Sequence, residues 1–198
     1  AGPYGVTYAD FLIRVGKAKQ AEAILKDVLR TTPGYVPAIR MLAQVYLMTG
    51  NIAGAQSMVE EARRLKGQGV LADQIQGGVY AATKNFDGST SSFKRAYEAS
   101  PSDVQPMLAL VRSYLRAGKT KEALSFVDSV VQASPDNNEA RLLQGQLEAL
   151  SGSKEKAASI FRKIIETDPK NPEGYLQLAN LMLYDKRLAD ADKAVSEG

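Results

Sequence analysis

The most constraining feature of this sequence is a set of prolines that recur at a fixed interval. Pro101, Pro135 and Pro169 are spaced 34 residues apart, and Pro33 lies two such intervals before Pro101. Gly67 occupies the position midway between Pro33 and Pro101. A period of this length, held without insertion, is typical of architectures in which one helix pair stacks on the next. The interval therefore predicts the fold before any local pattern is considered.

The period divides the chain into five complete units and a truncated sixth. We place these units at residues 2–35, 36–69, 70–103, 104–137, 138–171 and 172–198, and we number the positions within each unit from 1 to 34. Three positions keep one kind of residue. Position 8 holds Ala9, Ala43, Gly77, Val111, Gly145 and Ala179; position 20 holds Ala21, Ala55, Ser89, Ala123, Ala157 and Ala191; position 24 holds Leu25, Val59, Phe93, Val127, Phe161 and Val195.

These positions have a shared physical meaning. Small side chains at positions 8 and 20 allow two antiparallel helices to approach closely, and the larger residue at position 24 fills the space beside them. Position 15 ends the first helix because glycine adopts the left-handed conformation without a steric penalty; its glycines are Gly16, Gly50, Gly118 and Gly152. Proline at position 32 stops the second helix. The chain is therefore predicted to be all-α, with one antiparallel helix pair in each unit.

Composition excludes several classes of function. The 198 residues are 44% hydrophobic, with no cysteine, histidine or tryptophan. Disulfides, thiolate metal sites and imidazole bases are therefore absent from the chain, and we expect no metal site and no cofactor. Arg40 and Gln44 interrupt the most apolar stretch, at 36–48, so we expect no insertion into a membrane.

The net charge of +3 is spread along the chain, so we expect no binding to nucleic acid. The densest basic cluster is Arg63-Arg64-Leu65-Lys66, which follows two glutamates. It stands at the end of a predicted helix, where cations complement the helix dipole.

Several units carry matched sets of residues at these positions: Leu42, Ala43, Tyr46, Gly50 and Ala55; Tyr114, Gly118, Ala123 and Pro135; Gly152, Ala157, Phe161 and Pro169. On these residues the chain resembles the tetratricopeptide repeat (TPR) family over essentially its whole length. The resemblance implies an α-solenoid, a right-handed superhelix of antiparallel helix pairs forming one array over residues 1–198. It also implies a non-catalytic scaffold that binds a protein or peptide in a concave groove.

The family's groove is lined by the first helix of each unit, at positions 2, 5, 6, 9, 12 and 13. Carried over to this chain, those positions give the candidate partner-binding residues Arg40, Gln44, Met48, Leu108, Arg112, Arg116, Gln146, Asn180 and Tyr184. The same positions also include Leu47, Leu142, Leu150 and Gln177. No three consecutive units supply the Lys, Asn and Arg set with which chaperone-binding members hold a terminal carboxylate.

Two departures from the pattern carry expectations of their own. The third unit has Gly77 and Gly78 within its first helix and a Ser-rich run at 87–92, so we expect it to be the least stable. Residues 67–92 are then either a hinge or a drifted segment held by its neighbours, and the run at 87–92 is expected to cap its helix. Glu148 replaces the usual tyrosine, with Arg141 as its candidate partner or with its carboxylate pointing to solvent.

The sequence motifs include no phosphate loop, nucleophile elbow or calcium loop, so we expect no enzyme. The segments at 115–123 and 135–141 resemble those of bacterial repeat arrays that accompany exopolysaccharide export. This resemblance favours localisation in the periplasm or cell envelope over the cytoplasm. Two other hypotheses stay open: a substrate-recruiting domain of a larger enzyme, and self-assembly through an uncapped C-terminal end. The sixth unit stops within its second helix, so we expect a longer array or a face closed by a neighbouring molecule.

Overall fold

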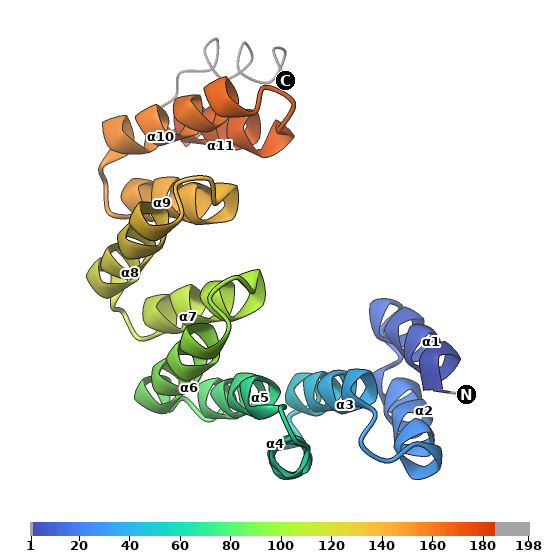
Figure 1. The fold of residues 1–198 in the computed structure, drawn as a ribbon. Helices are drawn as coiled ribbons and strands as arrows, with labels where there is room; N and C mark the ends of the chain where they lie inside the picture. The colour runs from blue at the N-terminus through green and yellow to red at the C-terminus, as the bar shows by residue number, and fades with distance from the viewer. Residues whose placement is uncertain (1, 185–198) are drawn as a thin grey trace. The chain divides into compact units, whose positions relative to one another are not determined.

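The computed structural model describes residues 2–184, and every regular element in this range is an α-helix. The helices are α1 (Gly2–Arg14), α2 (Ala18–Thr31), α3 (Val36–Met48), α4 (Ile52–Arg64), α5 (Gly69–Ala82), α6 (Phe86–Ala99), α7 (Val104–Arg116), α8 (Thr120–Ala133), α9 (Asn138–Leu150), α10 (Lys154–Thr167) and α11 (Pro172–Tyr184) (Figure 1). The prediction of two helices per unit is confirmed for the first five units. The truncated end of the sixth, from residue 185, lies outside the described residues.

The helix ends follow the predicted glycine and proline signals. Gly16, Gly50, Gly118 and Gly152 all have positive φ, between 71° and 89°, directly after the first helix of their units. Lys84 takes the same place in the third unit with φ of 60°, which is unusual for a residue with a Cβ. The prolines each lie two residues beyond the end of a second helix, as Pro135 does after Ala133.

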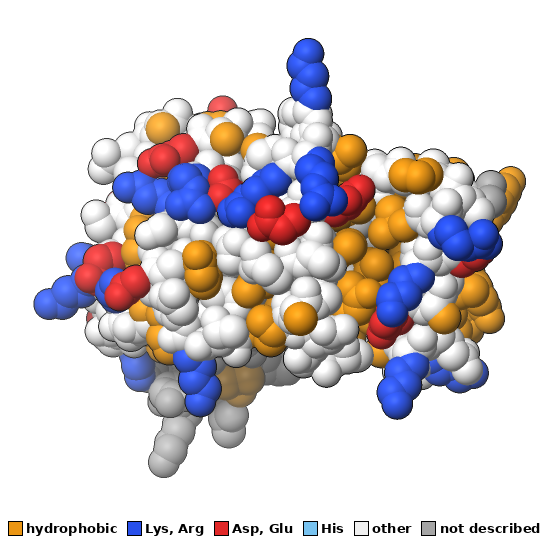
Figure 2. Space-filling model, turned by 90° about the horizontal axis from the view of Figure 1, so that it is seen from below, with side chains coloured by type: hydrophobic (Ala, Val, Ile, Leu, Met, Phe, Trp, Pro, Cys, Tyr) orange, Lys and Arg blue, Asp and Glu red, His pale blue; other side chains and the backbone are white. Residues whose placement is uncertain are grey.

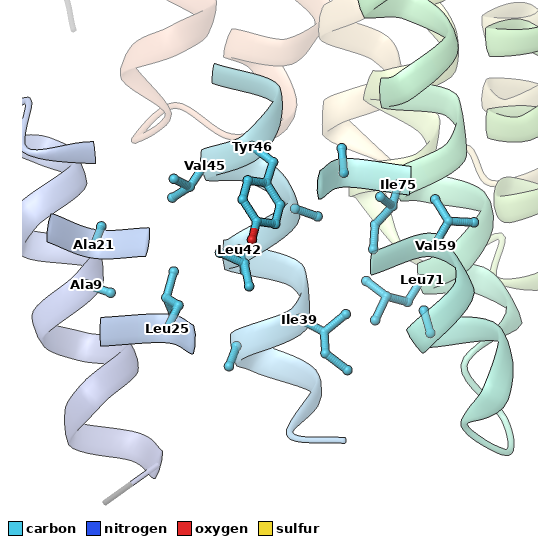
Figure 3. Close-up of a cluster of buried hydrophobic side chains, with 14 of the residues drawn as sticks. Ala9, Ala21, Leu25, Ile39, Leu42, Val45, Tyr46, Val59, Leu71 and Ile75 are labelled. Atoms are coloured by element: carbon cyan, nitrogen blue, oxygen red, sulfur yellow. The ribbon is translucent and has the colours of Figure 1, made fainter. Parts of the chain in front are cut away.

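The cores form where the small residues were predicted to bring helices together. Ala9, Ala21 and Ala55 are fully buried, and Ala43 is 2% exposed. In Figure 3, α3 stands between its neighbours and sends Val45 to one side and Ile39 to the other. Between Ala9 and Val79, each helix pair thus completes its core by packing against the next pair.

A glycine–phenylalanine pair replaces the usual small–aliphatic pair in two units. A Cβ at Gly77 would lie 2.8 Å from the ring of Phe93, and a Cβ at Gly145 would overlap the ring of Phe161. Where position 8 is alanine, position 24 is an aliphatic residue, as in the described pair Ala43 and Val59. The glycines therefore make room for a ring, and Gly77 has a packing role that its low helix propensity conceals.

The chain separates into two compact units at Ala117 and Gly118, between α7 and α8. One buried cluster runs from Ala9 to Val79 in the first unit, and another runs from Leu142 to Ala179 in the second. Residues 67–92 lie wholly within the first compact unit, and the boundary does not fall there. The hinge at 67–92 and the single array over 1–198 both stay predictions.

Two expectations about polar residues in these helices were wrong. Glu148 is buried, and the cation beside it is Lys156 on α10, at 3.9 Å, rather than Arg141. The cap of α6 is Asn85, whose Oδ1 accepts from the Gly88 N–H at 2.9 Å, and it precedes the Ser-rich run. Ser89 and Ser92 of that run are buried.

We predict that Gly145→Ala destabilises the protein by about 1–3 kcal/mol, although alanine is the better helix former, because Phe161 is 1% exposed and has no room to move. Urea unfolding monitored by circular dichroism measures the change. Adding Phe161→Leu should recover part of the loss, since the double variant restores the pairing of Ala9 with Leu25.

Gly69→Ala is the matched control, because a Cβ there meets nothing within 4 Å. It should leave stability unchanged or raise it by about 0.5–1 kcal/mol. Equal effects of the two substitutions would show that the ring does not select glycine.

Candidate partner-binding site

Side chains from α3, α5, α6 and α7 surround a hollow of about 400 Å³, which we call the Arg112 hollow. All of its residues belong to the first compact unit. They are Leu47, Met48, Gly78, Ala81, Ala82, Ser89, Phe93, Ala109, Arg112, Ser113 and Arg116.

The hollow exists because α5 presents almost no side-chain bulk to it. Gly78, Ala81 and Ala82 line it from α5. Leu47 on α3 leans over the backbone of α5, since a Cβ at Gly78 would lie 2.7 Å from Leu47 Cδ1. These small residues, of which Gly78 alone lowers the helix propensity, therefore open a space with apolar walls.

A cluster of hydroxyl groups forms the polar part of the wall. Ser113 Oγ donates to Ser89 Oγ at 3.0 Å, and Thr90 Oγ1 lies 3.0 Å from Ser113 Oγ. Thr90 also donates to the backbone carbonyl of Phe86. A nucleophilic serine needs a base within hydrogen-bond reach, and the chain has no histidine. The hydrogen bonds of the cluster join its hydroxyls to one another and to the backbone, which gives the hydroxyls a structural role.

Two exposed arginines stand one helical turn apart beside this wall. Arg112 and Arg116 both line the hollow from α7. Neither side chain forms an ion pair or a hydrogen bond with any residue in the described range 2–184. Guanidinium groups in this position can take a carboxylate with charge-assisted hydrogen bonds.

Many other cations in the described range are paired. Arg63 contacts Glu60 at 3.1 Å and Arg64 contacts Glu61 at 3.4 Å, within α4. Arg95 on α6 contacts Asp73 on α5 at 2.7 Å, and this hydrogen bond raises the pKa of Arg95. Figure 2 shows Lys and Arg side chains next to Asp and Glu side chains on the face it presents. The basic cluster at 63–66 is thus locally neutralised at its two arginines.

The structure brings together some of the predicted partner-binding residues and separates others. Met48, Arg112 and Arg116 line the same hollow, with Met48 57% exposed. Arg40 is exposed, but it donates to Gln74 Oε1 at 2.7 Å and so bridges α3 and α5. Gln44 is exposed and Leu108 is half-buried, and neither lines the hollow.

A second hollow of about 520 Å³ lies in the other compact unit. Its residues come from α9, α10, α11 and the turn after α9: Gln146, Ala149, Leu150, Gly152, Lys154, Phe161, Gln177, Asn180 and Leu181. Gln146 and Asn180 therefore meet, as the groove positions predict. Leu142 is buried in the core instead. The Tyr184 side chain lies outside the described residues.

The two hollows occupy equivalent places in the repeat. Phe93 lines the first and Phe161 lines the second, and these rings are 68 residues, or two repeats, apart. Both rings pack over a position-8 glycine. The polar groups differ, because Arg112 lies at the site that Asn180 occupies in the second hollow.

The sequence did not predict the contributions of Phe93, Ser89 and Ser113. A signal for the serines exists: Ser89 stands in a column of alanines, and Ser113 stands where Val45 and Val79 lie in other units. Two polar residues that face each other, at positions that are apolar in other units, indicate a buried polar pair. Recognising them required knowing that α6 and α7 meet at those residues.

No group of three or more His, Cys, Asp or Glu side chains in residues 2–184 could hold a metal ion. No helix in the same range has the length and hydrophobicity needed to span a membrane.

Helix pairs stacked in register, each completing its core on the next, define an α-solenoid repeat protein. Three models of the tetratricopeptide repeat match the sequence, at residues 12–72, 108–172 and 160–195, and together they account for well over half of it. The chain belongs to the tetratricopeptide repeat family. TPR repeats indicate a protein-interaction scaffold.

Relatives of the chain include larger bacterial proteins. It is 23% identical over 133 residues to the TPR repeat-containing protein YpiA of Bacillus subtilis, covering 66% of this chain and 31% of that protein. It is 27% identical over 155 residues to the cellulose synthase operon protein C of Pseudomonas fluorescens, covering 72% of this chain and 12% of that protein. The chain thus spans less than a third of either relative.

Solved structures share the fold at low sequence identity. A thermophilic TPR protein of Thermus thermophilus aligns with a TM-score of 0.63 at 18% identity, over 92% of this chain and all of that one. YrrB, described as a TPR protein with an unusual peptide-binding site, aligns with a TM-score of 0.52 at 21% identity, over 95% of this chain and 93% of that one.

We predict that Ser113→Val alone destabilises the protein by about 1 kcal/mol or more, because it removes a hydrogen-bond partner from the buried Ser89 hydroxyl. Combining it with Ser89→Ala should restore most of the stability, since the pair then matches Ala55 and Val79, which stand at the same two positions one repeat earlier. Urea unfolding of the single and double variants measures both effects. A double variant less stable than Ser113→Val would contradict this account of the cluster.

Proposed function

We propose that this chain is a non-catalytic scaffold that binds a segment of a partner protein at the Arg112 hollow. The segment places an apolar side chain in the hollow and a carboxylate against Arg112 and Arg116. The observation that carries this proposal is an apolar hollow of about 400 Å³ beside two arginines that have no partner within residues 2–184.

The shape of the hollow supports an apolar anchor. Its volume falls at the lower end of the range of ligand-binding pockets, which fits one or two large side chains. Leu47, Met48 and Phe93 provide the apolar contacts. The thioether side chain of Met48 is flexible, so it can adjust to ligands of different shape.

The energetics favour an extended segment over a single anchoring residue. Burying one large apolar side chain contributes about 1.5–3 kcal/mol, and a hydrogen bond to a charged group contributes roughly as much. A micromolar complex needs about 8 kcal/mol after the costs of association. The partner must therefore contact further residues, and the exposed Gln44 and the half-buried Leu108 are our candidates for those contacts.

We predict that Arg112→Glu/Arg116→Glu weakens capture of the partner by about tenfold to a hundredfold, because charge reversal repels a carboxylate. A pull-down from a lysate of the source organism, with quantitative mass spectrometry of the retained proteins, measures this. Raising the salt concentration should release the same partner, since ion pairs at a surface are screened.

The matched control is Lys121→Glu/Arg162→Glu, which changes the net charge by the same amount at two exposed cations on α8 and α10. It should retain the partner. Circular dichroism should show both variants folded like the wild type. Equal retention by both double variants would exclude the Arg112 hollow as the binding site.

A second proposal concerns the cellular setting. We propose that the chain serves a bacterial cell-envelope or polysaccharide-export assembly. The support is its similarity to the cellulose synthase operon protein C, together with the exopolysaccharide-array phrases at 115–123 and 135–141.

We predict that the native protein co-fractionates with the envelope or the periplasm, detected with an antibody against this chain after spheroplast preparation. A cytoplasmic enzyme standard controls for lysis. Recovery with that standard would overturn the setting, while the binding role would still be tested by the pull-down.

A further inference from the structure

The second hollow, between α9 and α11, has apolar walls and little charge. Leu150 and Leu181 are among its apolar residues. Lys154 is the single charged residue that lines it within the described range 2–184, and this lysine already has an interaction within the protein. We call this space the amide hollow, because three carboxamide side chains line it: Gln146, Gln177 and Asn180.

The amide hollow recurs with the repeat. Its counterpart, the Arg112 hollow, lies at the equivalent place two repeats earlier, between α5 and α7 in the middle of the chain. Leu150 is 63% exposed at position 13 beside the amide hollow, and Met48 is 57% exposed at the same position beside the other. Both hollows therefore offer an apolar side chain to a ligand, and they differ in their polar groups.

One carboxamide of the amide hollow has a fixed orientation. Gln177 Nε2 donates to Glu173 Oε1 at 2.7 Å, one turn earlier on α11. A carboxylate accepts hydrogen bonds and does not donate them, so the amino end of the Gln177 amide must face Glu173. Gln177 Oε1 accepts no hydrogen bond from another residue in the range 2–184. The hollow therefore contains an acceptor with a defined position.

The other two carboxamides have no hydrogen-bond partner within residues 2–184. Gln146 on α9 is half-buried, and Asn180 on α11 is exposed. Each offers two N–H donors and one carbonyl acceptor. Asn180 follows Gln177 by three residues, which places both on the same side of α11. Donors and acceptors therefore stand together along one apolar space.

A peptide group complements this arrangement, because it carries one N–H donor and one C=O acceptor. Its N–H can donate to Gln177 Oε1, and its C=O can accept from Gln146 or Asn180. A helical partner uses its main-chain groups within the helix, so only an extended segment has them available along its length. The apolar wall of the hollow then takes one side chain of that segment.

The low charge of the amide hollow determines which segment fits. A charged side chain buried beside Leu150 and Leu181 would find no available ion-pair partner among the lining residues, and burying an unpaired charge is costly. The Arg112 hollow, in contrast, has two arginines that can take a carboxylate. The two hollows therefore select segments of different charge.

We infer that the amide hollow is a second binding site, which holds an uncharged extended segment of a partner protein by its main chain. An apolar side chain of the segment fills the hollow, and its peptide groups pair with the carboxamides. This site acts without the Arg112 hollow. Because one anchor and a few hydrogen bonds must offset the costs of association, binding of a short segment alone is weak, with a dissociation constant of about 0.1–10 mM.

Titration of the full chain with the blocked peptide acetyl-Ser-Gly-Leu-Gly-Ser-amide, followed by nuclear magnetic resonance, tests the inference. The side-chain amide signals of Gln146 and Asn180 should shift and approach saturation at millimolar peptide. Replacing the peptide's leucine with N-methylleucine removes one N–H donor and should weaken binding by about twofold to tenfold, which is the contribution of one hydrogen bond. Replacing that leucine with aspartate should abolish the shifts, since the hollow excludes charge.

Gln146→Met/Asn180→Leu nearly preserves the side-chain volumes and removes both amides, so it should weaken binding of the peptide by about tenfold or more. Gln132→Met, at an exposed amide on α8, is the matched control and should leave binding unchanged. Circular dichroism checks that both variants fold. The N-methylleucine comparison uses the unaltered chain, so it tests the inference even where a variant does not fold.

Arg112→Glu/Arg116→Glu should also leave binding of the blocked peptide unchanged, which separates this inference from the function proposed for the Arg112 hollow. Loss of binding in that variant would place the peptide in the Arg112 hollow and overturn the inference. Absence of shifts at Gln146 and Asn180, or equal affinity for the leucine and N-methylleucine peptides, would overturn it as well. Shifts of the same signals with cellotetraose but not with the peptide would assign the hollow to a saccharide instead.

Discussion

Close approach of helices at a few small residues is the constraint on which the rest of this structure depends. Ala21, Ala55 and Ala157 have no exposed surface, and each lies on a second helix that packs against the first helix of its unit. A larger residue at these sites would push the two helices apart and remove the apolar contacts between them. Because each pair completes its core on the next, a local change in this packing also changes the surface of the neighbouring unit.

The candidate binding site follows from one such change. When position 24 carries phenylalanine, position 8 becomes glycine, and the ring packs against the helix backbone. The third unit adds Gly78, Ala81 and Ala82 on the exposed side of α5, so the neighbouring helices stand around an empty space. Gly78, which lowers the intrinsic stability of the third unit, therefore also helps to form the hollow.

The 34-residue period, with its recurring positions for small residues, glycine and proline, predicted the helices, their ends and much of the core. These features depend on short-range sterics. Arg112 and Met48, both taken from the groove positions, line one hollow, and Gln146 and Asn180 line the other; their contact with a partner stays a prediction. Leu142 stands at a groove position but is not exposed, because its side chain packs within the helix pair. The predicted partner of Glu148 was wrong, because Arg141 lies on the same helix, whereas the cation beside Glu148 is Lys156 on the next helix. The partner of a side chain is predicted wrongly where candidate partners lie on different helices, because the sequence does not give the distances between helices.

The sequence by itself determined that this chain is an α-solenoid of helix pairs, because a 34-residue period and its conformational signals act within each unit. Only the tertiary structure decided which polar groups are paired within the described residues and which are not. Ser89 and Ser113 are joined across α6 and α7, and Arg40 is joined to Gln74, while Arg112 and Arg116 have no protein partner in the described residues. The physical reason is that hydrogen bonds and ion pairs depend on distances between helices, which packing sets to within an ångström and a repeat pattern does not encode.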